Sequence, residues 1–186
     1  MSGSSEKELE RSHLWRVKVI AAILFSDLEE LEKVKKSLEA VFSKIDYQSE
    51  PYPFVFSDYY QEEMGGGLKR VLLSFKKLAK PEFLAASKLI TREFENNNSI
   101  QGKRKVNIDI GYLDLFKVVL ASFKGRGNKL YLSQGVWADI VLYFESGDYE
   151  TFLWGFPDFK EKTYNQDLIQ IRKLYKNQLK NHTGPA

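Results

Sequence analysis

The order of secondary structure predicted for the first 110 residues constrains the fold most. Val17–Phe25 is a short apolar run rich in valine and isoleucine, which indicates a buried strand. Apolar residues then recur at helical spacing over residues 27–43, and Leu68–Phe75 collects apolar residues on one face, as a strand does. A second helix over Pro81–Glu95 and a strand over Val106–Ile110 follow. Ile45–Tyr47 and Phe54–Phe56 look extended, and the prolines between them suit one edge strand. The order is then strand, helix, strand, strand, helix, strand, which is typical of ferredoxin-like folds.

The second half of the chain predicts an extension to this core. Tyr112–Phe123 is apolar nearly all round when it is drawn as a helix, which predicts a buried helix with Phe116 and Leu120 in the interior. A hairpin and a terminal helix follow at Lys129–Leu132, Val136–Glu145 and Asp167–Leu179. We therefore predict an α+β fold, a ferredoxin-like βαββαβ core with a C-terminal extension of buried helix, β-hairpin and terminal helix.

Length and composition predict one domain in a reducing compartment. The chain has 186 residues, of which 43% are apolar, and we place a single domain at residues 17–180 with polar tails at 1–16 and 181–186. The sequence has no cysteine, so disulfides, thiolate nucleophiles and thiolate metal sites are excluded. The longest apolar run, Val19–Phe25, is too short to span a bilayer. We expect a cytoplasmic protein.

Charge and histidine content narrow the function classes. The net charge of +3 is too small for a dedicated nucleic-acid binder, although basic residues gather at 103–105 and 124–129. His13 and His182 both lie in the tails, so a histidine-based triad or zinc site would need a tail to fold back. Gly65-Gly66-Gly67 lacks the spacing of a phosphate-binding loop and precedes a strand, so it predicts a flexible turn.

Acidic and aromatic residues gather in one short segment. Asp58, Glu62 and Glu63 flank Tyr59 and Tyr60. Asp58 and Glu62 share a face if the segment is helical, where two carboxylates could bind a hard cation or act as an acid and base pair. A solvated acidic turn explains the same residues.

Three further polar residues are predicted to meet this segment. Asn107 and Asp109 project from the same face of a strand, opposite its apolar residues, and Arg70 projects from the polar face of another strand. If these strands share one sheet and both helices cover its apolar face, the polar residues meet Asp58 on the other face. A ligand site or a structural ion-pair network would each explain such convergence.

The loop Lys124–Lys129 is cationic and rich in glycine. Such a loop suits contact with phosphate or a nucleic-acid backbone. It equally suits an ordinary helix stop, in which glycine adopts the left-handed cap conformation.

Short segments spread over most of the chain match the pattern of one known family. They are Phe25-Ser26, Phe54–Phe56, Ser57–Tyr60, Glu63–Gly65, Leu68–Arg70, Ser74-Phe75, Arg104, Val106–Asp109, Gly111-Tyr112, Val119–Ser122, Tyr131-Leu132, Gly135 and Pro157-Asp158. On these segments the chain resembles a prokaryotic family catalogued only as domain of unknown function number four-four-one-six. The resemblance runs from about Val17 to Leu179 and implies no activity.

The chain departs from the family pattern at Ile110, where the family has proline, at Asn128, where it has histidine, and at Gly155–Phe159. If that histidine is catalytic in the family, Asn128 cannot replace it.

These observations lead to one hypothesis and two alternatives. We expect the protein to bind an anionic, phosphate-bearing small molecule, with a carboxylate-bound divalent metal as the simplest mechanism if it is an enzyme. The first alternative is a nucleic-acid-binding module that uses a free sheet face and the two basic loops. The second is a scaffold or interaction protein without a ligand. The sequence leaves open whether the chain is an enzyme, which cofactor it uses and its oligomeric state. The expected ligand-binding residues are Asp58, Tyr59 (as an orienting group), Glu63, Arg70, Asn107, Asp109 and Lys124.

Overall fold

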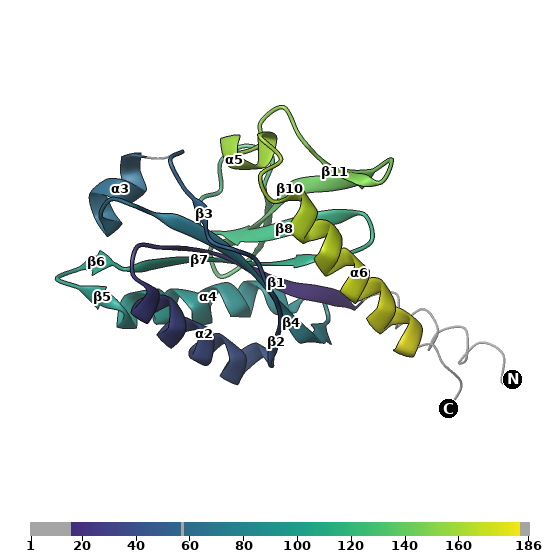
Figure 1. Cartoon of the computed structure of the whole chain (residues 1–186), viewed down its shortest axis with the longest axis horizontal. Coiled ribbons are helices and arrows are strands. Elements are labelled where there is room, and N and C mark those ends of the chain that lie inside the picture. The colour runs from purple at the N-terminus through teal and green to yellow at the C-terminus, as the bar shows by residue number, and fades with distance from the viewer. Residues whose placement is uncertain (1–15, 57, 183–186) are drawn as a thin grey trace, which may run out of the picture.

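The computed structural model describes residues 16–56 and 58–182 (Figure 1). Its helices are α2 (Leu28–Phe42), α3 (Asp58–Met64), α4 (Phe83–Asn97), α5 (Pro157–Lys160) and α6 (Asn165–His182). Its strands are β1 (Val17–Phe25), β2 (Ile45–Gln48), β3 (Tyr52–Pro53), β4 (Lys69–Ala79), β5 (Ser99–Ile100), β6 (Lys103–Arg104), β7 (Val106–Leu113), β8 (Lys117–Ser122), β9 (Leu130–Ser133), β10 (Val136–Glu145) and β11 (Asp148–Thr151).

One antiparallel sheet of nine strands organises the fold. Its main path runs β11-β10-β8-β7-β1-β4-β2, while β3 pairs with β4 and β9 pairs with β10. Strands β5 and β6 form a separate two-stranded sheet. The predicted α+β class is therefore confirmed. So is the prediction that β1, β4 and β7 are neighbours, because β1 lies between the other two.

Both faces of the sheet are covered, which explains why β1 is buried along its whole length and apolar at every position except Lys18. Alternate residues of β1, including Ala21 and Ile23, pack with buried residues of α2 and α4 in one cluster. These two helices lie on the same side of the sheet, as predicted (Figure 1). Ile20 and Ala22 point the other way and join a cluster that includes Ile171 and Tyr175 of α6.

The covered second face corrects the expectation of a free sheet face. Helix α6, at the predicted terminal-helix position, packs its apolar residues against this face, and its first turn is anchored by hydrogen bonds. Tyr47 and Tyr52 each donate a hydrogen bond of 2.6 Å to the carboxylate of Asp167. The amphipathic stripe of α6 would otherwise stay exposed to water, so it covers the sheet.

The buried helix predicted for Tyr112–Phe123 is wrong. Strand β7 continues to Leu113, the chain turns, and β8 begins at Lys117. The carboxylate of Asp114 accepts hydrogen bonds from the backbone N–H groups of Phe116 and Lys117, at 2.8 and 2.9 Å, which fixes the turn. Strands covered on both faces are apolar on both faces, so their sequence looks like that of a buried helix.

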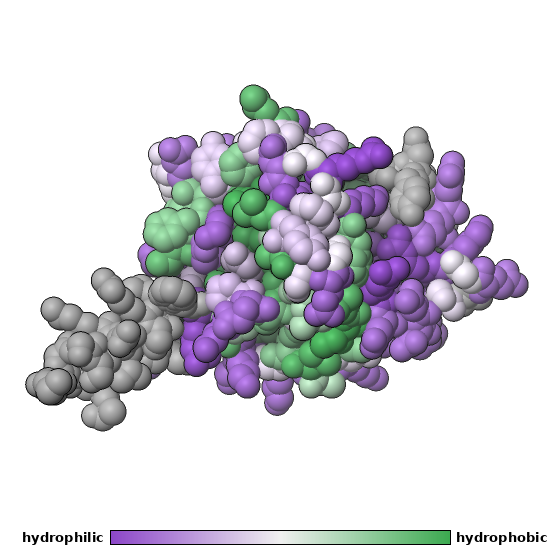
Figure 2. All heavy atoms as spheres, turned by 180° about the vertical axis from the view of Figure 1, so that it is seen from behind, coloured by the Kyte–Doolittle hydropathy of each residue, from purple (hydrophilic) through white to green (hydrophobic). Residues whose placement is uncertain are grey.

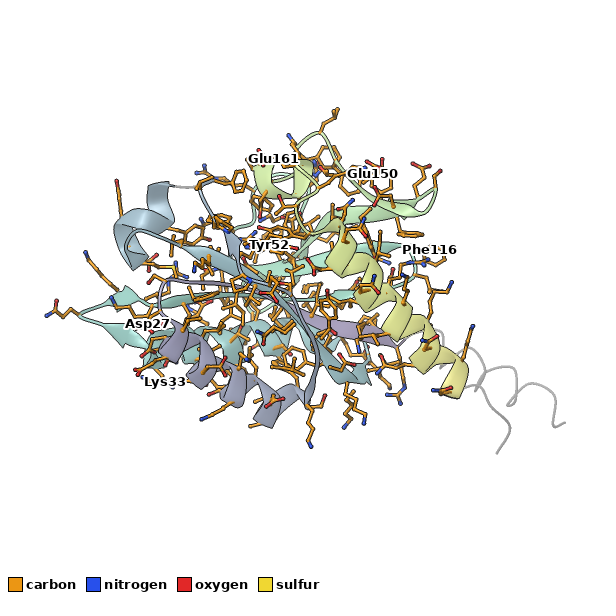
Figure 3. All side chains as sticks on the ribbon, in the orientation of Figure 1. Asp27, Lys33, Tyr52, Phe116, Glu150 and Glu161 are labelled. Atoms are coloured by element: carbon orange, nitrogen blue, oxygen red, sulfur yellow. The ribbon has the colours of Figure 1, made fainter. Side chains whose placement is uncertain are left out.

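The same correction separates the two residues expected in the interior. Leu120 on β8 is buried, as predicted, but Phe116 at the turn is 69% exposed. Figure 3 labels Phe116 at the outer end of the β7–β8 hairpin. The hairpin predicted next in the chain is confirmed as β9 and β10.

The triple glycine forms the predicted turn between α3 and β4. Gly65 and Gly67 have φ angles of 92° and 71°, a region that favours glycine. None of the helices among the described residues is long and apolar enough to cross a membrane.

Candidate functional site

The sheet opens between β7 and β8, and this opening creates the candidate site. The two strands pair from Gly111 with Leu120 to Leu113 with Val118, and before Gly111 they separate. At the separated edge of β7, two side chains of α4 form hydrogen bonds with the backbone of Ile108, in place of a neighbouring strand. Its N–H donates to Glu95 Oε1 at 2.6 Å, and its carbonyl accepts from Lys88 Nζ at 2.7 Å. Both side chains are buried, so they satisfy the backbone groups that the missing strand would pair.

A cavity of about 660 Å³ occupies this opening. That volume lies within the range of about 300–1,000 Å³ usual for small-molecule sites. Its walls come from α3, α4, β4, β7, β8, β10, α5 and the loop after β8. Hydrophilic residues crowd the adjoining end of the molecule, formed by α3, β5 and β6 (right in Figure 2). The charged residues of the walls are Arg70, Lys88, Arg92, Arg104, Lys124, Lys129, Glu63, Glu95, Asp109, Asp139 and Asp158.

Five of the seven sequence-predicted binding residues line this one cavity: Glu63, Arg70, Asn107, Asp109 and Lys124. The side chains of Asp58 and Tyr59 lie outside the described part of the structure. Strand register explains the convergence. Arg70 on β4 and Asn107 on β7 are both partners of Leu24 on β1, so the three residues form one row across the sheet. Asp109 belongs to the next row, beside Ala22.

Arg70 is held in a buried ion pair that the sequence did not predict. Its guanidinium contacts the carboxylate of Asp158, which also accepts a hydrogen bond from the Tyr164 hydroxyl at 3.1 Å. The guanidinium lies 4.5 Å from the ring centre of Phe54. Burial lowers the pKa of Arg70, but the charges of Asp158, Tyr164 and Asp109 outweigh burial and raise it above its ordinary value. Arg70 is therefore a fixed cation at the floor of the cavity.

Arg104 connects the acidic segment to α4 and β7. It donates to both oxygens of Glu63, at 2.6 and 2.7 Å, and approaches Glu95 at 3.3 Å. The hydrogen bonds from Arg104 hold the pKa of Glu63 below its usual range, whereas burial raises that of Glu95. Glu63 therefore orients Arg104, and its charge is already balanced.

Asn107 is buried with a donor that has no acceptor. Its Oδ1 accepts a hydrogen bond of 2.9 Å from Arg104, which fixes the orientation of the amide because arginine can only donate. The side-chain Nδ2 then lies buried without a hydrogen-bond partner among the described residues, and so does Nε of Arg70. Asn107 is only 4% exposed. Buried donors are costly to leave unsatisfied, so this part of the cavity needs an oxygen acceptor that the described residues do not supply.

Asp109 faces the same space with an open carboxylate. Its nearest cations are Arg70 at 3.7 Å and Lys88 at 3.8 Å, beyond ordinary hydrogen-bond length. Within the described part of the chain, its carboxylate accepts no hydrogen bond. The side chain is 26% exposed. Its oxygen lone pairs are thus available to a hydroxyl or amine in the cavity.

The mouth of the cavity carries cations. The Arg92 guanidinium lies 4.7 Å from the ring centre of Phe123 and forms no ion pair with a described residue. Lys124 begins the basic loop and lies close enough to Glu63 to lower the pKa of that carboxyl by its charge. Lys129 pairs with Asp139 at 3.2 Å. Asn128, where the family pattern has histidine, is exposed in the same loop.

Lys88 and Glu95 are the residues that sequence reasoning missed most clearly. The helix predicted at Pro81–Glu95 is present as α4, but its buried residues include Leu84, Lys88, Thr91 and Glu95. Spacings of four, three and four place these residues on one helix face, so two charged residues on an inward stripe were the signal. Among the described residues, no group of three or more His, Asp or Glu side chains is arranged to hold a metal ion.

Comparison with known proteins identifies a family. The profile of the family described as Domain of unknown function (DUF4416) matches residues 15–175. No curated protein and no solved structure matches the chain. The matched span includes every residue that lines the cavity. The chain therefore belongs to the family described as Domain of unknown function (DUF4416), which has no assigned activity.

Proposed function

We propose that the protein binds an anionic, phosphate-bearing small molecule in the cavity between β7 and β8. The observation that carries this proposal is a buried donor without an acceptor beneath a mouth that carries cations. Asn107 Nδ2 and Arg70 Nε require oxygen acceptors, and Arg92 lies at the entrance without an acidic partner among the described residues.

The charge balance of the walls supports an anion. Six cationic and five acidic side chains line the cavity, which gives its walls a net charge of +1. Ion pairs join Asp158 to Arg70, Asp139 to Lys129, and both Glu63 and Glu95 to Arg104. Arg92 adds a charge that this pairing does not cancel. Stacking on Phe123 leaves the edge of its guanidinium able to donate in plane, which is the geometry that suits phosphate oxygens.

A titration of the full chain with two anions tests the proposal. Isothermal titration calorimetry in a phosphate-free buffer at low salt would use pyrophosphate and n-butyl phosphate as probes. We expect saturable binding of at least one probe. Arg92→Gln should weaken it roughly ten- to a hundred-fold, because a hydrogen bond to a charged group contributes about 1.5–3 kcal/mol.

The matched control is Lys80→Gln, which removes one positive charge from a residue that does not line the cavity. The Lys80 side chain is exposed, and its nearest acidic partner, Glu82, is 4.0 Å away. Equal weakening by Lys80→Gln and Arg92→Gln would mean that the probes respond only to net charge. That result, or no binding of either probe, would overturn the proposal.

The ferredoxin-like topology, the cellular setting, the divalent metal and the nucleic-acid alternative, all expected from the sequence, remain proposals. The order β7-β1-β4-β2, with α2 and α4 on one face, supports describing residues 17–113 as a ferredoxin-like unit that β8, β10 and β11 extend. A prokaryotic, cytoplasmic setting and a divalent metal rest on the sequence alone. The nucleic-acid alternative loses its free sheet face to α6 and keeps only the basic loops.

A further inference from the structure

We propose that the ligand of this cavity also carries hydroxyl groups and is a phosphorylated sugar or polyol. The inference rests on the proposed anion site and specifies which end of the ligand lies where. The hydroxyl end contacts Asn107 and Asp109 at the floor, and the phosphate lies at the mouth beside Arg92.

The floor of the cavity presents a donor and an acceptor side by side. Asn107 Nδ2 is a buried donor without a described acceptor, and the Asp109 carboxylate accepts no hydrogen bond from a described residue. The two residues are two positions apart on the same face of β7. A hydroxyl group donates one hydrogen bond and accepts others, so it satisfies both side chains at once.

A phosphate at the floor would satisfy the donor of Asn107 but not the acceptor of Asp109. Its oxygens could accept from Asn107, but they would lie beside the carboxylate of Asp109, which lines the cavity and accepts no hydrogen bond from a described residue. Asp158 adds little repulsion, because it is paired with Arg70. Like charges repel, and burial strengthens the repulsion. The carboxylate of Asp109 strengthens a hydrogen bond donated by a hydroxyl. The charge pattern therefore assigns the neutral, hydroxyl-bearing end to the floor.

The mouth has the opposite character. Arg92 and Lys124 are exposed, and both line the cavity. A phosphate there keeps part of its hydration and gains in-plane donors from the Arg92 guanidinium. The ligand class that joins a charged end to a hydroxyl-rich neutral end is a phosphate monoester of a sugar or polyol.

The walls between floor and mouth suit the carbon skeleton of such a ligand. Phe54, Phe56 and Tyr60 form an aromatic cluster, in which ring centres lie 5.6 Å apart for the phenylalanines and 6.3 Å apart for Phe54 and Tyr60. All three line the cavity. The cavity volume of about 660 Å³ exceeds what a lone phosphate fills and accommodates a sugar phosphate.

Phosphate monoesters with and without hydroxyl groups test the hydroxyl assignment separately from the anion site. Calorimetry of the full chain would compare ribose 5-phosphate and glucose 6-phosphate with n-butyl phosphate, which carries the same charged group and no hydroxyl. We expect at least one sugar phosphate to bind at least ten-fold more tightly than n-butyl phosphate. This comparison uses the unmodified protein and depends on no variant.

A variant then locates the hydroxyl end. Asp109→Asn should weaken binding of that sugar phosphate at least ten-fold and leave binding of n-butyl phosphate unchanged or tighter, because it removes a negative charge. Asp109→Ser, which also keeps a polar group on β7, should show the same split if Asp109→Asn does not fold.

The outcomes distinguish the two proposals. Equal affinity for sugar phosphates and n-butyl phosphate would overturn the hydroxyl assignment and leave the anion site standing. Equal effects of the Asp109 variants on both classes of probe would also overturn it. If no monoester binds, this inference fails, and the anion site fails with it only if pyrophosphate does not bind either.

Discussion

Removing the carboxylate of Asp158 should destabilise the protein strongly, and the structure fixes the size of the effect. Arg70 and Asp158 are 6% and 2% exposed, so the variant Asp158→Ala leaves a guanidinium buried without its main partner. Loss of one member of a buried pair costs about 3–5 kcal/mol, a large share of a typical stability of about 5–15 kcal/mol. Asp109 at 3.7 Å compensates little, because it accepts no hydrogen bond from Arg70.

Urea unfolding followed by circular dichroism would measure this loss. With a slope of about 2 kcal/mol per molar urea, the midpoint should fall by roughly 2 M. The matched control is Glu32→Ala, which removes an exposed carboxylate paired with Lys35 at 2.7 Å on α2. Exposed pairs of this kind contribute less than about 1 kcal/mol, so the control should shift the midpoint little.

A double variant tests whether the cost comes from unpaired charge. Arg70→Met with Asp158→Leu replaces both charges by apolar groups, a change that is often neutral or stabilising for buried ion pairs. It should recover most of the stability that Asp158→Ala loses. A loss below about 1 kcal/mol in Asp158→Ala, or a double variant as unstable as the single one, would refute this reasoning.

Three further predictions follow from the fold and the site. Leu120→Ala should cost about 2–5 kcal/mol in urea unfolding because Leu120 is buried, whereas Phe116→Ala at the exposed turn should cost less than about 1 kcal/mol; similar losses would contradict the hairpin. Gly111→Ala should destabilise by about 1–3 kcal/mol, since an added Cβ would lie 2.2 Å from a carbonyl oxygen of β8, and an unchanged midpoint would contradict that close approach. The folded-state pKa of Glu63 lies below its ordinary 4.5, so its contribution is present above that pH and is lost as the pH falls through the folded value. Glu63→Gln should therefore flatten the acid side of the stability profile, and an unchanged profile would show that Arg104 does not stabilise the ionised carboxylate.

The part of the site that depends on the alternation of side chains along a strand could be predicted from the sequence. In a strand, residues two apart share a face, so Asn107 and Asp109 had to project together. Once β4 and β7 flank β1, Arg70 enters the same face. The sheet register then brings residues far apart in the chain into one cavity.

The side chains that reach from a helix to the sheet could not be predicted in this way. Lys88 and Glu95 reach the edge of β7 because β7 and β8 separate beyond Gly111, and that separation depends on tertiary structure. Asp158 lies on the four-residue helix α5, whose position follows from packing of Phe159 and Tyr164 in the second core cluster. The helical spacing of α4 indicates that Lys88 and Glu95 face inward but does not indicate what they contact, and Asp158 leaves no periodic signal in the sequence.

The wrong helix at Tyr112–Phe123 has a related cause. Hydropathy distinguishes a half-buried strand from a helix by its period, but a segment buried on both faces has no period to read. The Asp114 turn was the local signal for a hairpin, because its carboxylate bonds the backbone two and three residues further on.

A crystal of the full chain soaked in tungstate would test the central claim most directly. Tungstate is a tetrahedral oxyanion like phosphate, and its anomalous scattering locates it without ambiguity. The account predicts a peak at the mouth of the cavity, with oxygens within hydrogen-bond distance of the Arg92 guanidinium, and loss of that peak in Arg92→Gln. Tungstate bound only at other surfaces of the molecule, with the cavity empty of it, would contradict the account.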